Sequence, residues 1–179
     1  MVQASVGMLK MAYGRLPVQI QIVMTCLNDS QTARLLNQFE TVLTMADALP
    51  EEQLRYRPVP DKWSAFEQLA HIGCYTAFFH DHRLRVMLEA AEPPAFGRYR
   101  AEDDPEFAGW TQMEKAPMLA RLVAQRQQLT NRLMGLTEAE LSRRASHPLF
   151  GELDVPGWTE FFLLHEAHHL YATLRLIRS

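Results

Sequence analysis

Near the C-terminus, residues 161–171 form an apolar stretch with the residue spacing of a helix that faces a protein core. Its core-facing positions recur every three or four residues and are Phe162, His165, His169, Ala172 and Leu176. Two imidazoles therefore occupy positions where leucine would be expected, and burying both without partners costs several kcal/mol. They lie one turn apart, a spacing at which both rings reach one metal ion. We expect a metal site, with a hydrogen-bonded pair of core histidines as the alternative.

A metal centre needs a third ligand, and the best candidate lies on another helix. His168 is about 100° away around the final helix and is the weaker candidate. Ser64 and Glu67 form an S-x-x-E capping box that begins a long helix, and His71 follows two turns later. A lone histidine is more often a core residue, but the C-terminal pair lacks a partner. Cys74 is either a further ligand, a reactive thiol or, more simply, a small buried residue.

The composition indicates one globular domain: 179 residues, 47% of them hydrophobic and 22% charged. A net charge of −3 gives no basic field for a nucleic acid, so none is expected as a partner. Two cysteines are too few for a disulfide scaffold. The apolar stretch 16–26 is interrupted by two glutamines and lacks the small residues of a processing site, and no run is long enough for a membrane span. We predict a cytoplasmic protein.

The periodicity along the chain predicts an all-α fold. Residues 1–28 are a separate N-terminal extension, with a short alternation at 18–22, and residues 29–179 form the bundle. The four main helices are expected at 30–48, 64–90, 112–135 and from Pro156 onward, with a second capping box at 137–140. No segment predicts a convincing sheet. A long polar loop from Pro93 to Pro105 is expected to be a lid or rim, with His80 and His82 near it.

Three histidines on two helices would supply three neutral nitrogen ligands and leave a coordination position open, which is the catalytic arrangement. Zinc and nickel both suit imidazole. Glu166 is adjacent to a ligand and is a candidate proton acceptor, although it could equally be an exposed helix residue. Residues 165–169 formally match H-E-x-x-H, but a bundle of this size offers no substrate-cleft sheet, so we do not expect a peptidase.

Three segments together resemble the DinB/YfiT-like superfamily: residues 63–72 (WSAFEQLAHI), 148–153 (PLFGEL) and 165–169 (HEAHH). The resemblance covers residues 29–179 and implies a four-helix bundle of up-down-down-up topology, often a homodimer. It also implies a divalent metal, nickel or zinc, held by His71, His165 and His169. Characterised relatives include S-transferases that use bacillithiol or mycothiol, maleylpyruvate isomerases, and proteins described as metal-dependent hydrolases.

Two function hypotheses follow. The first is a metal-dependent S-transferase or hydrolase that transfers a low-molecular-weight thiol, or water, to a small-molecule substrate. The second is a non-catalytic stress-response or ligand-binding protein in which the metal is structural. The chain departs from the family pattern at 171–173, where a glutamine is often found and this sequence has Tyr-Ala-Thr. That difference concerns the substrate pocket more than the metal ligands.

Overall fold

The computed structural model describes residues 26–178, so the alternation at 18–22 and most of the predicted N-terminal extension lie outside the described residues. In chain order the elements are α1 (Asp29–Asn37), α2 (Glu40–Asp47), α3 (Glu51–Arg55), α4 (Ala65–Ala77), the π-helix η1 (Phe78–Leu84), α5 (Arg85–Glu89), the 3₁₀-helix η2 (Ala101–Asp103), α6 (Pro105–Thr111), α7 (Lys115–Met134), α8 (Glu138–Leu141), β1 (Arg144–His147), β2 (Gly151–Asp154) and α9 (Val155–Ile177).

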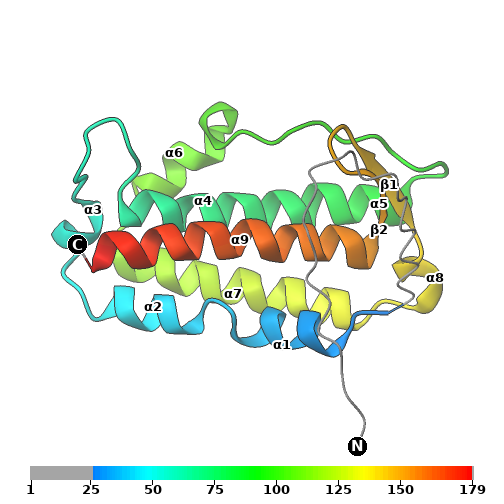
Figure 1. Cartoon of the computed structure of the whole chain (residues 1–179), viewed down its shortest axis with the longest axis horizontal. Coiled ribbons are helices and arrows are strands. Elements are labelled where there is room, and N and C mark those ends of the chain that lie inside the picture. Colours follow the sequence, from blue (N-terminus) through cyan, green and yellow to red (C-terminus); the bar gives the residue numbers. More distant parts are fainter. Residues whose placement is uncertain (1–25, 179) are drawn as a thin grey trace, which may run out of the picture.

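Four long helical segments form the bundle: α1–α2, α4–η1–α5, α7 and α9 (Figure 1). The first and last run in one direction and the middle two in the other, so the topology is up-down-down-up (Figure 1). The two middle segments are parallel because residues 90–114 return the chain along the bundle before α7 begins. The predicted four-helix bundle is confirmed. Among residues 26–178, no helix combines the length and apolar character that crossing a membrane requires.

The second segment begins as the sequence predicts. The Ser64 hydroxyl accepts a hydrogen bond from the Glu67 backbone N–H, and the Glu67 carboxylate accepts one from the Ser64 N–H, so two otherwise unpaired helix-end donors are satisfied. The helix then continues through η1 into α5 as one rod. A π-helical stretch is rare and recurs at functional sites, and nothing in the sequence predicts it here.

The first predicted helix is interrupted. Asn28, not Asp29 or Ser30, caps α1, and the helix breaks at residues 38–39 before α2. At the break, the Gln38 side chain reaches α9, where its Nε2 donates to the Leu163 carbonyl at 2.9 Å and to the Glu166 carboxylate at 2.8 Å. No glycine or proline marks this position in the sequence. The break could not be predicted because the partners of Gln38 lie on a helix more than 120 residues away.

The prediction of an open loop at 93–105 is only partly correct. Residues 101–103 form the 3₁₀-helix η2, and α6 begins at Pro105. The third long helix consequently begins at Lys115 and not at 112. Trp110, 1% exposed, anchors α6 on α4 at Gly73, where an added Cβ would lie 2.5 Å from the indole ring. A glycine inside a helix is therefore explained by the close approach of a tryptophan.

The prediction of no sheet is wrong. Strands β1 and β2 form an antiparallel hairpin in which Arg144 faces Asp154 and His147 faces Gly151. Gly151 has a φ of 70°, a conformation that glycine adopts without strain, and this permits the tight return after Pro148. The hairpin covers one end of the bundle and leads directly into α9 (Figure 1). Asp154 caps that helix by accepting from the Gly157 N–H, with Pro156 in the first turn as predicted.

Apolar side chains fill the bundle in two clusters along its length. One includes Leu69, Ile72 and Leu170, and the other includes Phe162 and Leu163 with residues of the hairpin end. Helix α4 packs on α9 and on α6 and α7, so it is the central element of the fold. The histidines of α9 lie between the two clusters, at the level where α4 and α9 pack together.

Candidate metal centre

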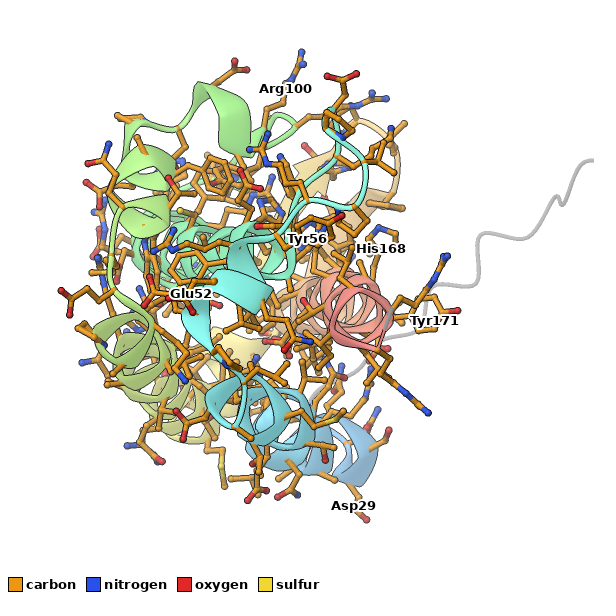
Figure 2. All side chains as sticks on the ribbon, turned by 90° about the vertical axis from the view of Figure 1, so that its left-hand side faces the viewer. Asp29, Glu52, Tyr56, Arg100, His168 and Tyr171 are labelled. Carbon is orange, nitrogen blue, oxygen red and sulfur yellow. The ribbon has the colours of Figure 1, made fainter. Side chains whose placement is uncertain are left out.

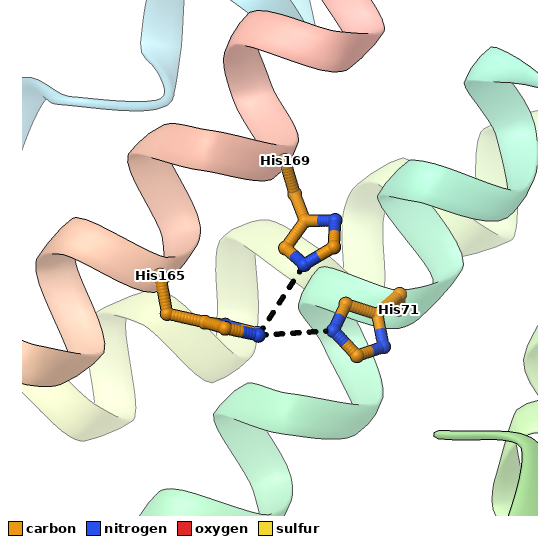
Figure 3. Close-up of side chains that lie close together, drawn as sticks. All are labelled: His71, His165 and His169. Carbon is orange, nitrogen blue, oxygen red and sulfur yellow. Dashed lines mark hydrogen bonds between the residues drawn. The ribbon is translucent and has the colours of Figure 1, made fainter. Parts of the chain in front are cut away.

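The structure brings the three predicted ligands together from the two packed helices, His71 from α4 and His165 and His169 from α9 (Figure 3). The Nε2 atom of His165 lies 3.3 Å from the Nε2 atom of His71 and 3.3 Å from that of His169. The ligand atoms of all three rings lie within 4.8 Å of one another. The same nitrogen of each ring faces a common point, which is the arrangement that one bound ion requires.

The spacing of these nitrogen atoms fits a tetrahedral ion. A metal–nitrogen bond of about 2.0–2.1 Å gives a tetrahedron with edges of about 3.3–3.4 Å, which matches the two separations. In such a tetrahedron the three histidines would hold three corners, and the fourth would be open to a solvent molecule or a substrate. The donor set therefore fits zinc, and imidazole donors also suit nickel.

Gln68 fixes the orientation of one ligand. Its Oε1 lies 2.7 Å from the Nδ1 of His169 and can only accept a hydrogen bond, so this Nδ1 carries the proton. In a neutral ring the Nε2 then presents a lone pair toward the other two histidines. Such second partners of ligating histidines set both the tautomer and the ring orientation.

The α9 histidines are neutral near pH 7. Burial lowers the pKa of His165 to about 3, and the neighbouring His71 and His168 add to the effect. Burial likewise lowers the pKa of His169 to about 2, together with His71 and His165. A metal ligand must be unprotonated, so His165 and His169 keep their nitrogen lone pairs available over the whole neutral range.

Aromatic rings surround the three histidines. The Trp63 ring centroid lies 5.0 Å from that of His71 and 6.0 Å from that of His169, and Tyr99 lies 6.0 Å from His71. Tyr75 packs against His165 at 3.9 Å. Trp63 and Tyr99 are half-buried, as are the two α9 histidines, so the centre is sheltered but accessible. These rings restrict water and present apolar faces to a bound molecule.

Arg83, in η1, holds part of this aromatic wall. The side chain is 1% exposed, and its guanidinium donates to the Tyr75 hydroxyl at 3.1 Å and to the Gly97 carbonyl at 2.8 Å. It also lies 4.8 Å from the Phe78 ring centroid, within cation–π range. The same residue thus connects Tyr75, which contacts His165, to the segment that carries Tyr99.

Glu166 does not face the three histidines. It is 1% exposed and forms an ion pair with Arg126 of α7, and it also accepts from Gln38. The prediction that Glu166 could be an exposed residue is wrong. Its carboxylate is committed to partners on the α1–α7 side of α9, and this placement gives no support to its predicted role as a proton acceptor.

The remaining candidates stay outside the centre. Cys74 is 2% exposed in the apolar core, and burial raises the pKa of its thiol to about 12, so it is the small buried residue and not a reactive thiolate. His168 is exposed. His80 is hydrogen-bonded to Asp81, and His82 stacks on Phe78. Within residues 26–178, the group that could hold a metal contains His71, His165 and His169 alone.

Gln68 and Tyr75 were not predicted as site residues, yet their positions carried a signal. They lie three residues before and four residues after His71, on the same face of one helix. A side chain at either spacing points toward the same partner helix as the ligand. Arg83 and Tyr99 had no such signal, because the π-helical turn and the course of residues 90–104 bring them to the site.

The fold and the site define a helical-bundle protein with a three-histidine centre, and sequence comparison identifies its family. Residues 34–172 match the DinB superfamily. The match spans most of the chain, and the chain therefore belongs to this family.

Relatives and solved structures agree with this assignment. The chain is 27% identical over 137 residues to the uncharacterised protein YuaE of Bacillus subtilis, over 68% of this chain and 82% of that protein. YfiT from B. subtilis, described as a probable metal-dependent hydrolase with an unusual four-helix bundle topology, has a TM-score of 0.61 at 18% identity, covering 85% of this chain and 89% of YfiT. The DinB-like protein YjoA from B. subtilis has a TM-score of 0.57 at 17% identity, over 84% and 90% of the chains. These structures share the fold.

Proposed function

We propose that the chain is a metal-dependent enzyme that transfers a thiol, or water, to a small-molecule electrophile. The convergence of three Nε2 atoms from α4 and α9 supports this proposal most directly. Three histidines with an open fourth position are typical of catalytic centres, whereas structural zinc sites are closed by four protein ligands. The description of YfiT as a probable metal-dependent hydrolase points in the same direction.

The chain's own residues have distinct parts in this proposal. His71, His165 and His169 hold the ion, and Gln68 keeps the His169 ring in the ligating tautomer. When bound, a divalent ion supplies Lewis acidity that lowers the pKa of a thiol or water and polarises a carbonyl. Trp63 and Tyr99 border the open side and contact the substrate.

The Glu166 carboxylate is bound by Arg126 and Gln38 on another side of α9, so it is not placed to accept the nucleophile's proton. In this proposal the proton passes to solvent. The half-buried position of the α9 histidines lets water reach the centre. A thiol or water molecule whose pKa is lowered close to neutrality needs no stronger base.

Metal content is the first test. We expect untagged protein to bind about one equivalent of zinc or nickel per chain. His71→Ala and His169→Ala should each abolish this binding, whereas the matched control His168→Ala, which removes an adjacent exposed imidazole, should retain it. The parent should then show metal-dependent turnover with a panel of thiols and electrophiles or with a panel of esters. Elemental analysis and these assays provide the two measurements.

The alternative is a non-catalytic binding protein in which the same centre is structural. One equivalent of metal without turnover on either panel would favour it. Protein that takes up neither zinc nor nickel on reconstitution would contradict both metal proposals, and the three histidines would then be a hydrogen-bonded core cluster.

A further inference from the structure

A groove with a volume of about 620 Å³ lies beside the metal centre. One wall is the loop between α3 and α4, including Val59 and Lys62, and the other is the C-terminal part of α9, including Arg175 and Leu176. Figure 2 views this end of the bundle, where the loop that carries Tyr56 passes beside α9. The volume is within the range of about 300–1,000 Å³ that is usual for small-molecule sites.

Two side chains belong to both the groove and the surroundings of the metal centre. Trp63 borders the groove, and its ring also packs on His71 and His169. Gln68 borders the groove as well, and its Oε1 is the acceptor for the His169 Nδ1. A molecule in the groove would therefore lie against the side chains that support the ligands.

The groove carries an excess of positive charge although the whole chain is acidic. Its charged lining residues are Lys62, Arg175 and Asp61, which is two cations and one anion. Within residues 26–178, no ion pair involves the Lys62 ammonium or the Arg175 guanidinium, whereas the buried Arg126 is paired with Glu166. Arg175 has the ring of Tyr171 at 6.0 Å as its neighbour. Two cations against one anion give the groove a net positive charge, which attracts an organic anion.

The loop that forms the outer wall is held in place before any ligand binds. Arg57 is paired with Glu67 and also donates to the Pro60 carbonyl at 3.2 Å. Glu67 is the residue that caps α4 together with Ser64. The loop is thus attached to the start of the helix that carries His71, and a preformed wall lowers the entropic cost of binding.

We propose that this groove binds the substrate or co-substrate of the metal centre as an organic anion. A carboxylate would lie between Lys62 and Arg175, and an apolar body would pack on Trp63, Val59 and Leu176. The assignment of this ligand to the metal's reaction rests on the proposed function. Anion binding by the groove does not, and it can be measured separately.

The test compares hexanoate with its neutral isostere hexanamide, using tryptophan fluorescence of the full chain. Trp110 and Trp158 are 1% and 0% exposed, so a ligand-dependent change reports on the half-buried Trp63. Metal-free protein is titrated first, because a carboxylate could otherwise bind the ion directly. We expect hexanoate to bind more tightly than hexanamide. Lys62→Gln and Arg175→Gln should each weaken hexanoate by about fivefold, the effect of one exposed ion pair, and leave hexanamide unchanged.

The matched control is Arg132→Gln, an equal change of charge on the exposed surface of α7. It should not alter hexanoate binding. Equal affinities for the two ligands, or equal losses in all three variants, would overturn the proposal. So would a groove variant that changes the oligomeric state in sedimentation without changing hexanoate binding, because the groove would then be a protein contact. If the metal-loaded parent shows no turnover but still binds hexanoate, the proposed function is contradicted and the anion site is retained.

Discussion

At the scale of single residues, Gln68 makes a sharp test of the metal centre because it touches a ligand and would not touch the ion. Its Oε1 accepts the His169 Nδ1 proton at 2.7 Å. We expect Gln68→Ala to weaken zinc affinity by about 10- to 100-fold, the usual effect of removing such a partner. Competition with a chromogenic chelator measures it. Gln68→Glu, which keeps an acceptor, should restore much of the affinity, and unchanged affinity in both variants would contradict this role.

The ion pair of Arg126 and Glu166 makes a second prediction, about stability. Their side chains are 7% and 1% exposed, so removing one partner leaves the other charge buried. We expect Glu166→Ala to lower the free energy of unfolding by about 3–5 kcal/mol. The double variant Arg126→Met with Glu166→Met should recover most of this loss. Urea unfolding measures both free energies. If the double variant folds but loses turnover, Glu166 has a catalytic role and not only a structural one.

These residues also show what periodicity alone can predict. His165 and His169 were identifiable because two imidazoles occupy the apolar seam of α9. The neighbouring Glu166 is more deeply buried than either histidine, but its partner lies on α7, so local spacing could not distinguish an exposed carboxylate from a paired one. Site residues that lie one turn apart on one helix could be predicted from the sequence. Partners on helices distant in the sequence could not.

At the scale of elements, the packing of α6 on α4 depends on Gly73. An added Cβ would lie 2.5 Å from the ring of the buried Trp110, and a large ring in a packed core has little room to move. We expect Gly73→Ala to destabilise the protein by about 1–3 kcal/mol through overpacking, despite the gain in helix propensity. Gly109→Ala is the control, because nothing lies within 4 Å of its added Cβ, and it should be neutral or stabilising. Thermal unfolding compares them, and a stabilised Gly73→Ala would contradict this packing.

The elements that the sequence predicted correctly are those with local signals at their ends. The capping boxes at Ser64 and Thr137 begin helices as expected. Helix α6 and the break after α1 were missed because Trp110 and Gln38 obtain their partners from remote segments. At these positions tertiary contacts, and not local sequence preferences, decide the structure. The β1–β2 hairpin pairs locally, but each strand has only four residues, too few for a clear alternating pattern.

At the scale of the whole molecule, the candidate metal centre joins α4 to α9, two helices that pack extensively on each other. An ion bound by the folded chain stabilises it by mass action, by about 2.7 kcal/mol at a free concentration 100 times the Kd. We expect saturating zinc to raise the Tm by several degrees in the parent and in His168→Ala, and to leave the Tm of His169→Ala unchanged. Calorimetry measures the shift. An equal rise in all three would place the stabilising ion elsewhere.

The metal-free protein should lose stability as the solution is acidified from pH 6.5. Burial lowers the folded-state pKa of His165 to about 3 and of His169 to about 2, from an ordinary value of 6.5. Below pH 6.5 the unfolded chain therefore binds protons that the folded chain does not, so the stability that is fully present above pH 6.5 falls as the pH decreases. Carboxylates titrate below about pH 5, so the window from 6.5 to 5 isolates the histidines. Urea unfolding at half-unit intervals should show this slope in the parent and in His168→Ala, and a smaller one in His165→Leu. An equal slope in all three proteins would mean that His165 binds its proton equally in the folded and unfolded chain, which would contradict its lowered pKa.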